Sequence, residues 1–165
     1  MKKLISICGS DVSDENLSDY ALNIAEKLGR QIAKKGAVVV CGGHGGVMEA
    51  ACRGAKKENG ITVGILPETK NESNKYIDIA IPTLLGNIRN VLVASAGDTV
   101  IAIGGRWGTL NEISYAMITE KKLILMMGTG GCVDEIINGN IMQNIESSYF
   151  IANTVEEAIK EAFNE

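Results

Sequence analysis

Histidine, proline and aromatic residues are scarce in this sequence, and none of its four cysteines lies in a CxxC pair. His44 is the only histidine. A structural zinc site needs four closely spaced cysteine or histidine ligands, which this sequence does not supply. Cys8 and Cys41 end apolar runs, and this pattern predicts buried thiols. We therefore expect no metal site and a protein that resides in a reducing compartment.

Long apolar runs and clusters of basic residues are also missing. No apolar run approaches the roughly 18 residues of a membrane-spanning helix, and the run at residues 4–8 is too short for the core of a signal peptide. The chain has 16 Lys and Arg against 20 Asp and Glu, a net charge of −4. Because general nucleic-acid binding needs clustered cations, this balance disfavours it. We expect a cytoplasmic protein without a membrane or nucleic-acid partner.

The 165 residues, 45% of them hydrophobic, fit one domain spanning residues 1–165. Short apolar runs alternate with helical patterns along it. Strands are expected at residues 4–8, 37–41, 61–66, 77–81, 99–103, 123–127 and 149–152. One helix is expected to begin after a cap at Ser13 and to end at Gly36, and others are expected over residues 47–58, 84–96 and 109–121. A capping box at Thr154 is expected to open the last helix. Residues 68–75 are expected to form a polar surface loop.

The strands are apolar throughout and do not alternate, which is typical of a parallel sheet covered on both faces. The sequence therefore predicts an α/β, Rossmann-like three-layer fold with a mainly parallel sheet. In such sheets ligands bind beyond the carboxyl ends of the strands.

Glycine-rich turns follow four of the expected strands. Backbone N–H groups and helix N-termini converge at such turns, so they predict a site for a phosphorylated, nucleotide-like ligand. Purely structural turns are the alternative, because tight turns need glycine anyway. No turn has the GxGxxG or GK[ST] spacing, which disfavours a dinucleotide dehydrogenase and a P-loop NTPase. The candidate binding residues are Gly9, Ser10, Gly42, Gly43, His44, Gly45, Gly46, Met48, Gly104, Gly105, Arg106, Trp107, Gly108, Thr109, Gly128, Thr129 and Gly130.

Three side chains within these turns could contact a ligand, and two of them also have a structural interpretation. Arg106 could pair with a phosphate, and Trp107 could stack on a base. Trp107 could equally pack against a helix or a neighbouring subunit. His44 could bond a ligand phosphate or base, or it could be an exposed loop histidine.

The turns at residues 42–50 (GGHGGVMEA) and 104–112 (GGRWGTLNE) resemble the paired motifs of the LOG superfamily. This group includes cytokinin riboside 5′-monophosphate phosphoribohydrolases and molybdenum cofactor carrier proteins. The run RNVLV from Arg89 and the turn at residues 128–131 look most similar to the carrier branch. The resemblance covers nearly the whole chain. It implies a carrier or sensor that binds a nucleotide or molybdenum cofactor without turning it over and requires no other cofactor.

The alternative that the resemblance implies is a phosphoribohydrolase that cleaves the N-glycosidic bond of nucleoside 5′-monophosphates. Arg89 and Glu112 match the Arg and Glu of those enzymes; Glu112 would stabilise positive charge on the ribose, and Arg89 would hold the phosphate or orient Glu112. Placed in a first helical turn, Glu112 would be favoured in its ionised form. The spacing from Thr109 to Glu112 also fits a capping box with no catalytic role. The hydrolases usually have Pro-Gly-Gly where this chain has Gly104, Gly105 and Arg106.

The resemblance further implies a homo-oligomer, a dimer or larger. The helix expected at residues 84–96 is a candidate interface, because the small residues Ala94 and Ala96 lie near its end. A scaffold with a relic pocket is the third functional interpretation.

Overall fold

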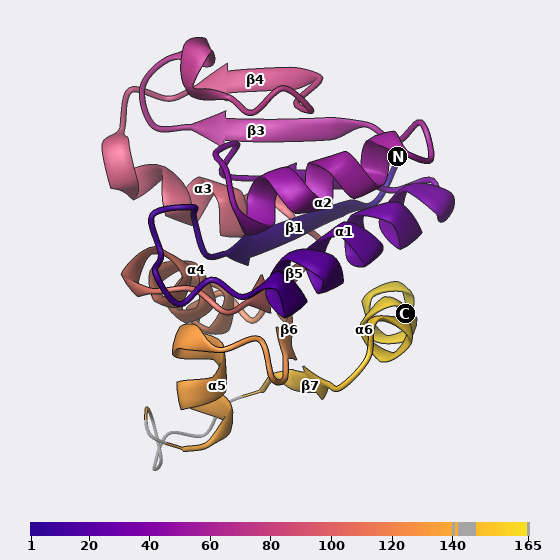
Figure 1. Ribbon diagram of the computed structural model, residues 1–165, viewed down its shortest axis with the longest axis vertical. Coiled ribbons are helices and arrows are strands. Elements are labelled where there is room, and N and C mark those ends of the chain that lie inside the picture. The colour runs from indigo at the N-terminus through magenta and orange to yellow at the C-terminus, as the bar shows by residue number, and fades with distance from the viewer. Residues whose placement is uncertain (140, 142–147, 165) are drawn as a thin grey trace.

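The computed structural model describes residues 1–139, 141 and 148–164. Seven strands form one sheet in the order β4-β3-β2-β1-β5-β6-β7, and every neighbouring pair is parallel (Figure 1). The strands are β1 (Leu4–Gly9), β2 (Val38–Cys41), β3 (Thr62–Leu66), β4 (Ile79–Pro82), β5 (Thr99–Ile103), β6 (Lys122–Met126) and β7 (Phe150–Ala152).

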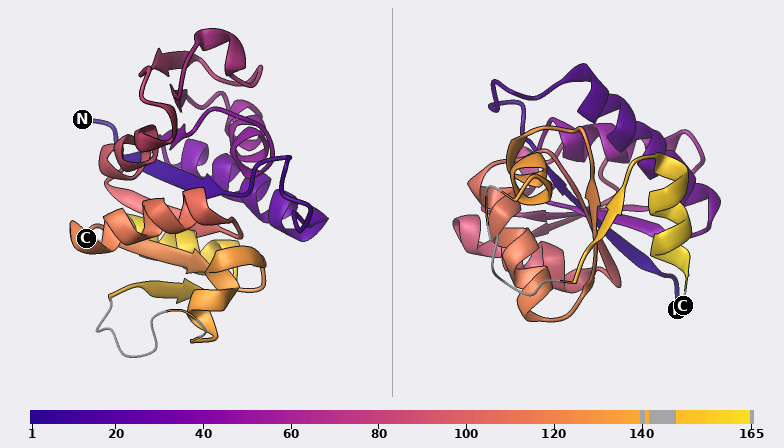
Figure 2. Two further views of the ribbon diagram at one scale, coloured as in Figure 1. Left: turned by 90° about the vertical axis from the view of Figure 1, so that its left-hand side faces the viewer. Right: turned by 90° about the horizontal axis from the view of Figure 1, so that it is seen from below.

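Helices cover both faces of this sheet, as the two further views make plain (Figure 2). One layer consists of α1 (Asp19–Lys34), α2 (Val47–Lys56) and α6 (Val155–Phe163), and the other of α3 (Arg89–Ala96), α4 (Trp107–Ile118) and α5 (Gly131–Ile137). Two short 3-10 helices, η1 (Lys70–Glu72) and η2 (Gly86–Ile88), lie in the connections. No helix in the described part of the chain is long and apolar enough to cross a membrane.

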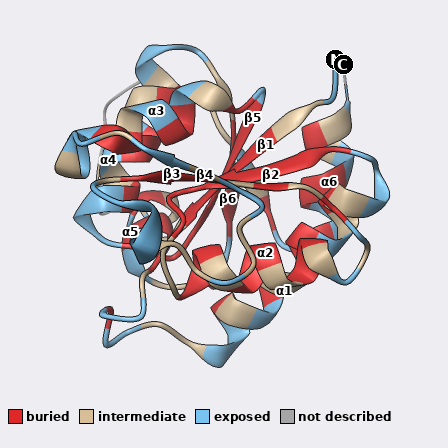
Figure 3. Cartoon of the chain, turned by 90° about the horizontal axis from the view of Figure 1, so that it is seen from above, coloured by how far each residue is buried: buried red, intermediate tan, exposed pale blue. Residues whose placement is uncertain are grey.

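The central strands β1, β2, β5 and β6 bury both of their faces, as expected, whereas the edge strand β4 is mostly exposed and departs from the expectation. Ile5 and Ile7 of β1 pack into the core under α1, α2 and α6, whereas Cys8 packs into the core under α3, α4 and α5. Figure 3 shows the strands buried at the centre and the helices buried only along their inner sides. The α/β, Rossmann-like three-layer fold is confirmed.

The order of the strands reverses at β1. From β1 the chain builds outward through β2, β3 and β4, and it then returns to place β5 on the other side of β1. The connections after β1 and β5 therefore leave the sheet in opposite directions. Such a switch point opens a crevice at the carboxyl ends of the strands, where α/β proteins bind ligands.

Three helix starts differ from the expectation, and the smallest difference is that α4 begins at Trp107 and not at Thr109. The first helix begins at Asp19 with Ser18 as its cap, not Ser13, and the Ser18 side chain accepts a hydrogen bond from the Ala21 N–H at 3.1 Å. The reason lies in residues 11–17, which turn twice before the helix: the Asp14 N–H donates to the Asp11 carbonyl, and the Asp14 carbonyl accepts from Leu17.

The helix expected over residues 84–96 begins only at Arg89. Leu84 has φ 58° and Gly86 has φ 54°, left-handed conformations that no α-helix continues through, and η2 occupies the next turn. The loop expected at residues 68–75 contains η1. The ends expected at Gly36 and Thr154 are confirmed, since Gly36 has φ 75° directly after α1 and the Thr154 side chain caps α6.

Candidate functional site

A cavity of about 400 Å³ opens at the switch point, beyond the carboxyl ends of β1 and β5. Its wall combines the loop after β1, the starts of α2, α3 and α4, and one residue of η2. The lining residues are Gly9, Ser10, Asp11, Ser13, Asp14, His44, Met48, Asn87, Arg89, Asn90, Arg106, Trp107, Gly108, Thr109 and Glu112.

The cavity gathers candidates from the first three glycine-rich turns, together with Arg89 and Glu112. The remaining candidates lie outside its lining: Gly42, Gly43, Gly45, Gly46, Gly104, Gly105, Gly128, Thr129 and Gly130. Sequence reasoning missed five lining residues: Asp11, Ser13, Asp14, Asn87 and Asn90. Their positions offered a signal, since three directly follow the Gly9–Ser10 turn and two flank Arg89.

Ser10 ties the first three turns together. Its hydroxyl accepts a hydrogen bond from the Gly105 N–H at 2.8 Å, and its carbonyl accepts from the Val47 N–H at 2.9 Å. These bonds tie the starts of α2 and α4 to one residue of the cavity wall. The first amides of a helix have no partner within it, and they carry partial positive charge. Two helix N-termini therefore face one cavity, an arrangement that favours an anion.

The fourth turn, at Gly128–Gly130, braces the third turn instead of lining the cavity. The Thr129 hydroxyl accepts from the Gly104 N–H at 2.8 Å and donates to the Met126 carbonyl at 2.7 Å. The N–H groups of Gly128 and Gly130 both donate to the Asp134 carboxylate at 2.8 Å. Since a carboxylate already occupies these amides, we restrict the binding proposal below to the first three turns.

Arg89 is a buried cation in the cavity wall, with only 8% of its surface exposed. Its guanidinium packs against the backbone of Gly42, where a Cβ atom would lie 2.2 Å from Nη1. Arg89 Nε is buried and has no hydrogen-bond partner in the described part of the chain. An unpaired buried N–H of a charged group raises the free energy of the folded protein, so an anion that enters the cavity would find a favourable partner in this arginine.

Glu112 lies beside Arg89, with 3.9 Å between Oε1 and the Arg89 Nη1. Burial raises the pKa of Glu112 to about 7, although the Arg89 charge and a hydrogen bond from the Cys8 thiol oppose the shift. This corrects the expectation of an ionised carboxylate in a first helical turn. The helix begins at Trp107 with Arg106 as its cap, so Glu112 lies in its second turn, and the capping box from Thr109 to Glu112 does not form.

We predict that Glu112→Gln changes the pH dependence of stability. Folding raises the pKa of Glu112 to about 7, so the folded protein binds this proton more tightly than the unfolded chain does. The resulting stabilisation is complete below about pH 4 and is lost as the pH rises through 7. The wild-type free energy of unfolding should fall by about 2 to 3 kcal/mol relative to the variant between pH 5 and pH 9. Urea unfolding across this range measures the difference, and parallel curves for the two proteins would contradict the prediction.

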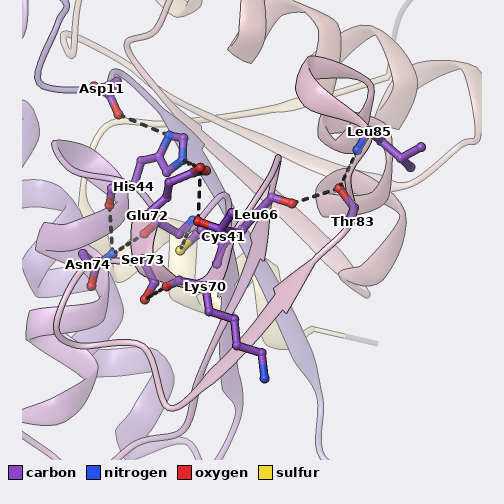
Figure 4. Close-up of polar contacts among 12 residues, drawn as sticks. Asp11, Cys41, His44, Leu66, Lys70, Glu72, Ser73, Asn74, Thr83 and Leu85 are labelled. Carbon is purple, nitrogen blue, oxygen red and sulfur yellow. Dashed lines mark hydrogen bonds and ion pairs between the residues drawn. The ribbon is translucent and has the colours of Figure 1, made fainter.

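His44 lies between two carboxylates at the edge of the cavity (Figure 4). Nδ1 is 3.9 Å from Asp11 Oδ2, and Nε2 is 3.8 Å from Glu72 Oε2. The Asn74 side chain donates to the carbonyls of Gly43 and His44 at 3.1 and 2.8 Å. His44 therefore joins the loop after β1 to the segment around η1, and it is not a freely exposed loop residue.

Arg106 and Trp107 form an exposed rim where α4 begins. Trp107 is 81% exposed and joins neither hydrophobic core of the described residues, which leaves its ring open to a ligand or another protein surface. Arg106 Nη1 donates to the Ser13 carbonyl at 3.5 Å, across the cavity mouth. No group of three or more His, Cys, Asp or Glu residues in the described part of the chain is arranged to hold a metal ion.

Comparison with known proteins assigns the family. The model of the SLOG cluster4 family matches residues 2–159. The chain belongs to this family. The match confirms the predicted resemblance to the LOG superfamily.

Solved structures of two molybdenum cofactor proteins match almost the whole chain. The molybdenum cofactor binding protein of Rippkaea orientalis is 35% identical, with a TM-score of 0.82 over 97% of this chain and 94% of that one. The molybdenum cofactor carrier protein of Chlamydomonas reinhardtii is 29% identical, with a TM-score of 0.80 over 97% of this chain and 95% of that one. An uncharacterized protein of Archaeoglobus fulgidus is 40% identical over 72% of this chain and 76% of its own length. The resemblance to the carrier branch is thus confirmed.

Proposed function

We propose that this chain is a carrier or sensor that binds a phosphorylated, nucleotide-like ligand in the switch-point cavity without turning it over. The main support is the buried Arg89, whose Nε has no hydrogen-bond partner among the described residues, in a cavity that two helix N-termini also face. These groups suit a phosphate. Trp107 suits the stacking of a base or another flat ring.

The two solved relatives support the carrier interpretation. Their names state that they bind or carry molybdenum cofactor. By this likeness we propose molybdenum cofactor or a nucleotide of similar size as the ligand, with no other cofactor required.

Isothermal titration with matched pairs of nucleotide and nucleoside tests the proposal. Guanosine monophosphate and guanosine, or adenosine monophosphate and adenosine, differ only in the phosphate. We expect saturable binding of at least one nucleotide and much weaker binding of its nucleoside. Equal binding of the two members of every pair, or no binding of any, would contradict a phosphate site.

A phosphoribohydrolase is the second candidate, and the Glu112–Arg89 pair favours it. A buried carboxyl group with a pKa of about 7 can exchange a proton with a substrate at neutral pH. Arg89 lies close enough to orient it. Release of free base from a nucleoside monophosphate, abolished by Glu112→Gln, would identify this activity.

We also propose a homo-oligomer, because α3, η2 and the two residues before η2 present exposed apolar side chains that no described part of the chain covers. Leu84, Leu85, Ile88 and Leu92 are all exposed there. Exposed apolar patches on this scale mark protein interfaces. A second copy of the chain is the partner we propose, by the resemblance to the superfamily.

Ile88→Asp is expected to shift the protein from an oligomer to a monomer, because it places a charge in this apolar patch. Light scattering coupled to gel filtration measures the mass. Tyr20→Asp is the control, since Tyr20 is also exposed but lies on α1 in the opposite layer. A wild-type protein that is already monomeric, or equal effects of both variants, would contradict the proposed interface.

A reducing, cytoplasmic location is proposed as well, because all four cysteines are free thiols and buried. We further propose that residues 1–165 act as one nucleotide-binding domain and that general nucleic-acid binding plays no part, given the net charge of −4.

A further inference from the structure

Asp14 places a buried carboxylate in the wall of the cavity. Only 6% of its surface is exposed, and it forms no ion pair with any described residue. One oxygen, Oδ1, accepts a hydrogen bond from the Asn16 N–H at 3.1 Å. An ionised carboxylate has about four acceptor positions, so this bond leaves most of them open. A buried carboxylate without a cation is costly, and it calls for donors that arrive with a ligand.

The cavity therefore contains groups that attract an anion and groups that repel one. Arg89, Arg106 and the N-termini of α2 and α4 favour an anion, whereas the carboxylates of Asp11, at the edge, and of the more deeply buried Asp14 repel one. A ligand that satisfies both carries a phosphate and, away from it, a group rich in N–H donors. Trp107, in the same lining, suits a planar group of this kind.

Among bases, few present two adjacent donors to one carboxylate. Guanine does so through N1–H and the 2-amino group, and pterins share this 2-amino-4-oxopyrimidine edge. Adenine presents an unprotonated N1 at the equivalent position, which a carboxylate would repel. Hypoxanthine has the N1–H but lacks the amino group. A carboxylate can accept both guanine donors at once, one on each oxygen.

We propose that Asp14 is a specificity-determining residue that selects a phosphorylated ligand with a 2-amino-4-oxopyrimidine edge, a guanine nucleotide or a phosphorylated pterin. The inference rests on the proposed nucleotide-like ligand and adds the identity of its ring.

Titration calorimetry with guanosine, inosine and adenosine monophosphates tests this proposal, and neopterin monophosphate separates the pterin from the nucleotide source. The wild type should bind guanosine monophosphate about tenfold or more tightly than adenosine monophosphate, with inosine monophosphate between them. Asp14→Asn keeps the shape but loses one acceptor, so the three affinities should converge. Glu15→Gln removes a charge from the exposed part of the same loop and should keep the preference. Tight binding of neopterin monophosphate alone would identify the pterin source.

Several outcomes would overturn the proposal. Equal wild-type affinities for the three nucleotides, with no tighter binding of neopterin monophosphate, would do so without any variant, even if Asp14→Asn failed to fold. Equal weakening of all three by Asp14→Asn would indicate a contact to the shared ribose. Binding that requires Mg²⁺ and loses this requirement in Asp14→Asn would place a metal-bound phosphate at Asp14. These results would leave the phosphate site intact, whereas failure of every phosphorylated probe would contradict the proposed function as well.

Discussion

Gly29→Ala is expected to lower the free energy of unfolding by about 3 kcal/mol. Gly29 lies in α1 where this helix meets α2, and a Cβ atom there would come within 1.9 Å of the Ala51 carbonyl oxygen. Gly54 of α2 makes the reciprocal contact, since its Cβ would lie 1.9 Å from the Glu26 carbonyl oxygen. Both obstacles are backbone atoms of a helix, so no side-chain rotation relieves them. The two helices would have to move apart and give up buried contacts on one face of the sheet.

Urea unfolding of Gly29→Ala and of Gly108→Ala measures this effect against a matched control. Gly108 is also helical, but a Cβ there would meet only the Asn90 side chain, at the ordinary distance of 3.5 Å. Alanine is the better helix former by up to about 1 kcal/mol, so the control should be neutral or stabilised. Similar changes in the two variants would contradict the close packing of α1 on α2.

Arg89→Met is expected to weaken the binding of a phosphorylated ligand about a hundredfold. The variant removes a buried guanidinium whose Nε has no other partner in the described part of the chain, and hydrogen bonds to charged groups contribute about 1.5 to 3 kcal/mol each. Glu112 can take up a proton near neutral pH, so the loss of Arg89 does not strand a buried charge. Calorimetry at pH 7 with guanosine monophosphate measures the loss.

Variants of two further arginines provide comparisons for the effect of Arg89→Met on ligand affinity. Arg30→Met removes an exposed arginine that pairs with Glu58, and it should leave binding unchanged. Arg106→Ala, at the exposed rim, should cost about tenfold, because solvent weakens its contact with a phosphate. Unchanged affinity in Arg89→Met, with the variant folded, would show that the phosphate does not reach the buried part of the cavity.

The sequence predicts the fold well because its strands and most of its helices follow regular patterns. The apolar strands and the period of α1 identify these elements without tertiary information. The wrong helix starts lie where the local backbone conformation determines where a helix begins. Leu84 adopts a left-handed conformation that its side chain disfavours, so the apolar pattern of residues 84–96 suggests a longer helix than exists. At Ser13 a loop with its own hydrogen bonds displaces the helix start to Asp19.

Lining residues that belong to sequence motifs were among the candidates, whereas lining residues whose position depends on the shape of a loop were not. The glycine-rich motifs mark three of the turns around the cavity, and the family resemblance selects Arg89 and Glu112. No local pattern indicates that Glu112 is buried, which decides its pKa. In the sequence alone, Asp14 is indistinguishable from an ordinary surface acid. The folded loop after β1 buries it in the cavity wall.

Mass spectrometry of the small molecules released by denaturing freshly purified protein shows whether the chain carries a phosphorylated ligand. We expect a phosphorylated compound with a nucleotide or pterin ring, present in the wild type and depleted in Arg89→Met. The same purified protein, incubated with nucleoside 5′-monophosphates, should return them intact. Free base and ribose 5-phosphate, absent with Glu112→Gln, would contradict the carrier interpretation and identify a phosphoribohydrolase. A wild-type protein that releases no phosphorylated compound and binds none would contradict the phosphate site itself.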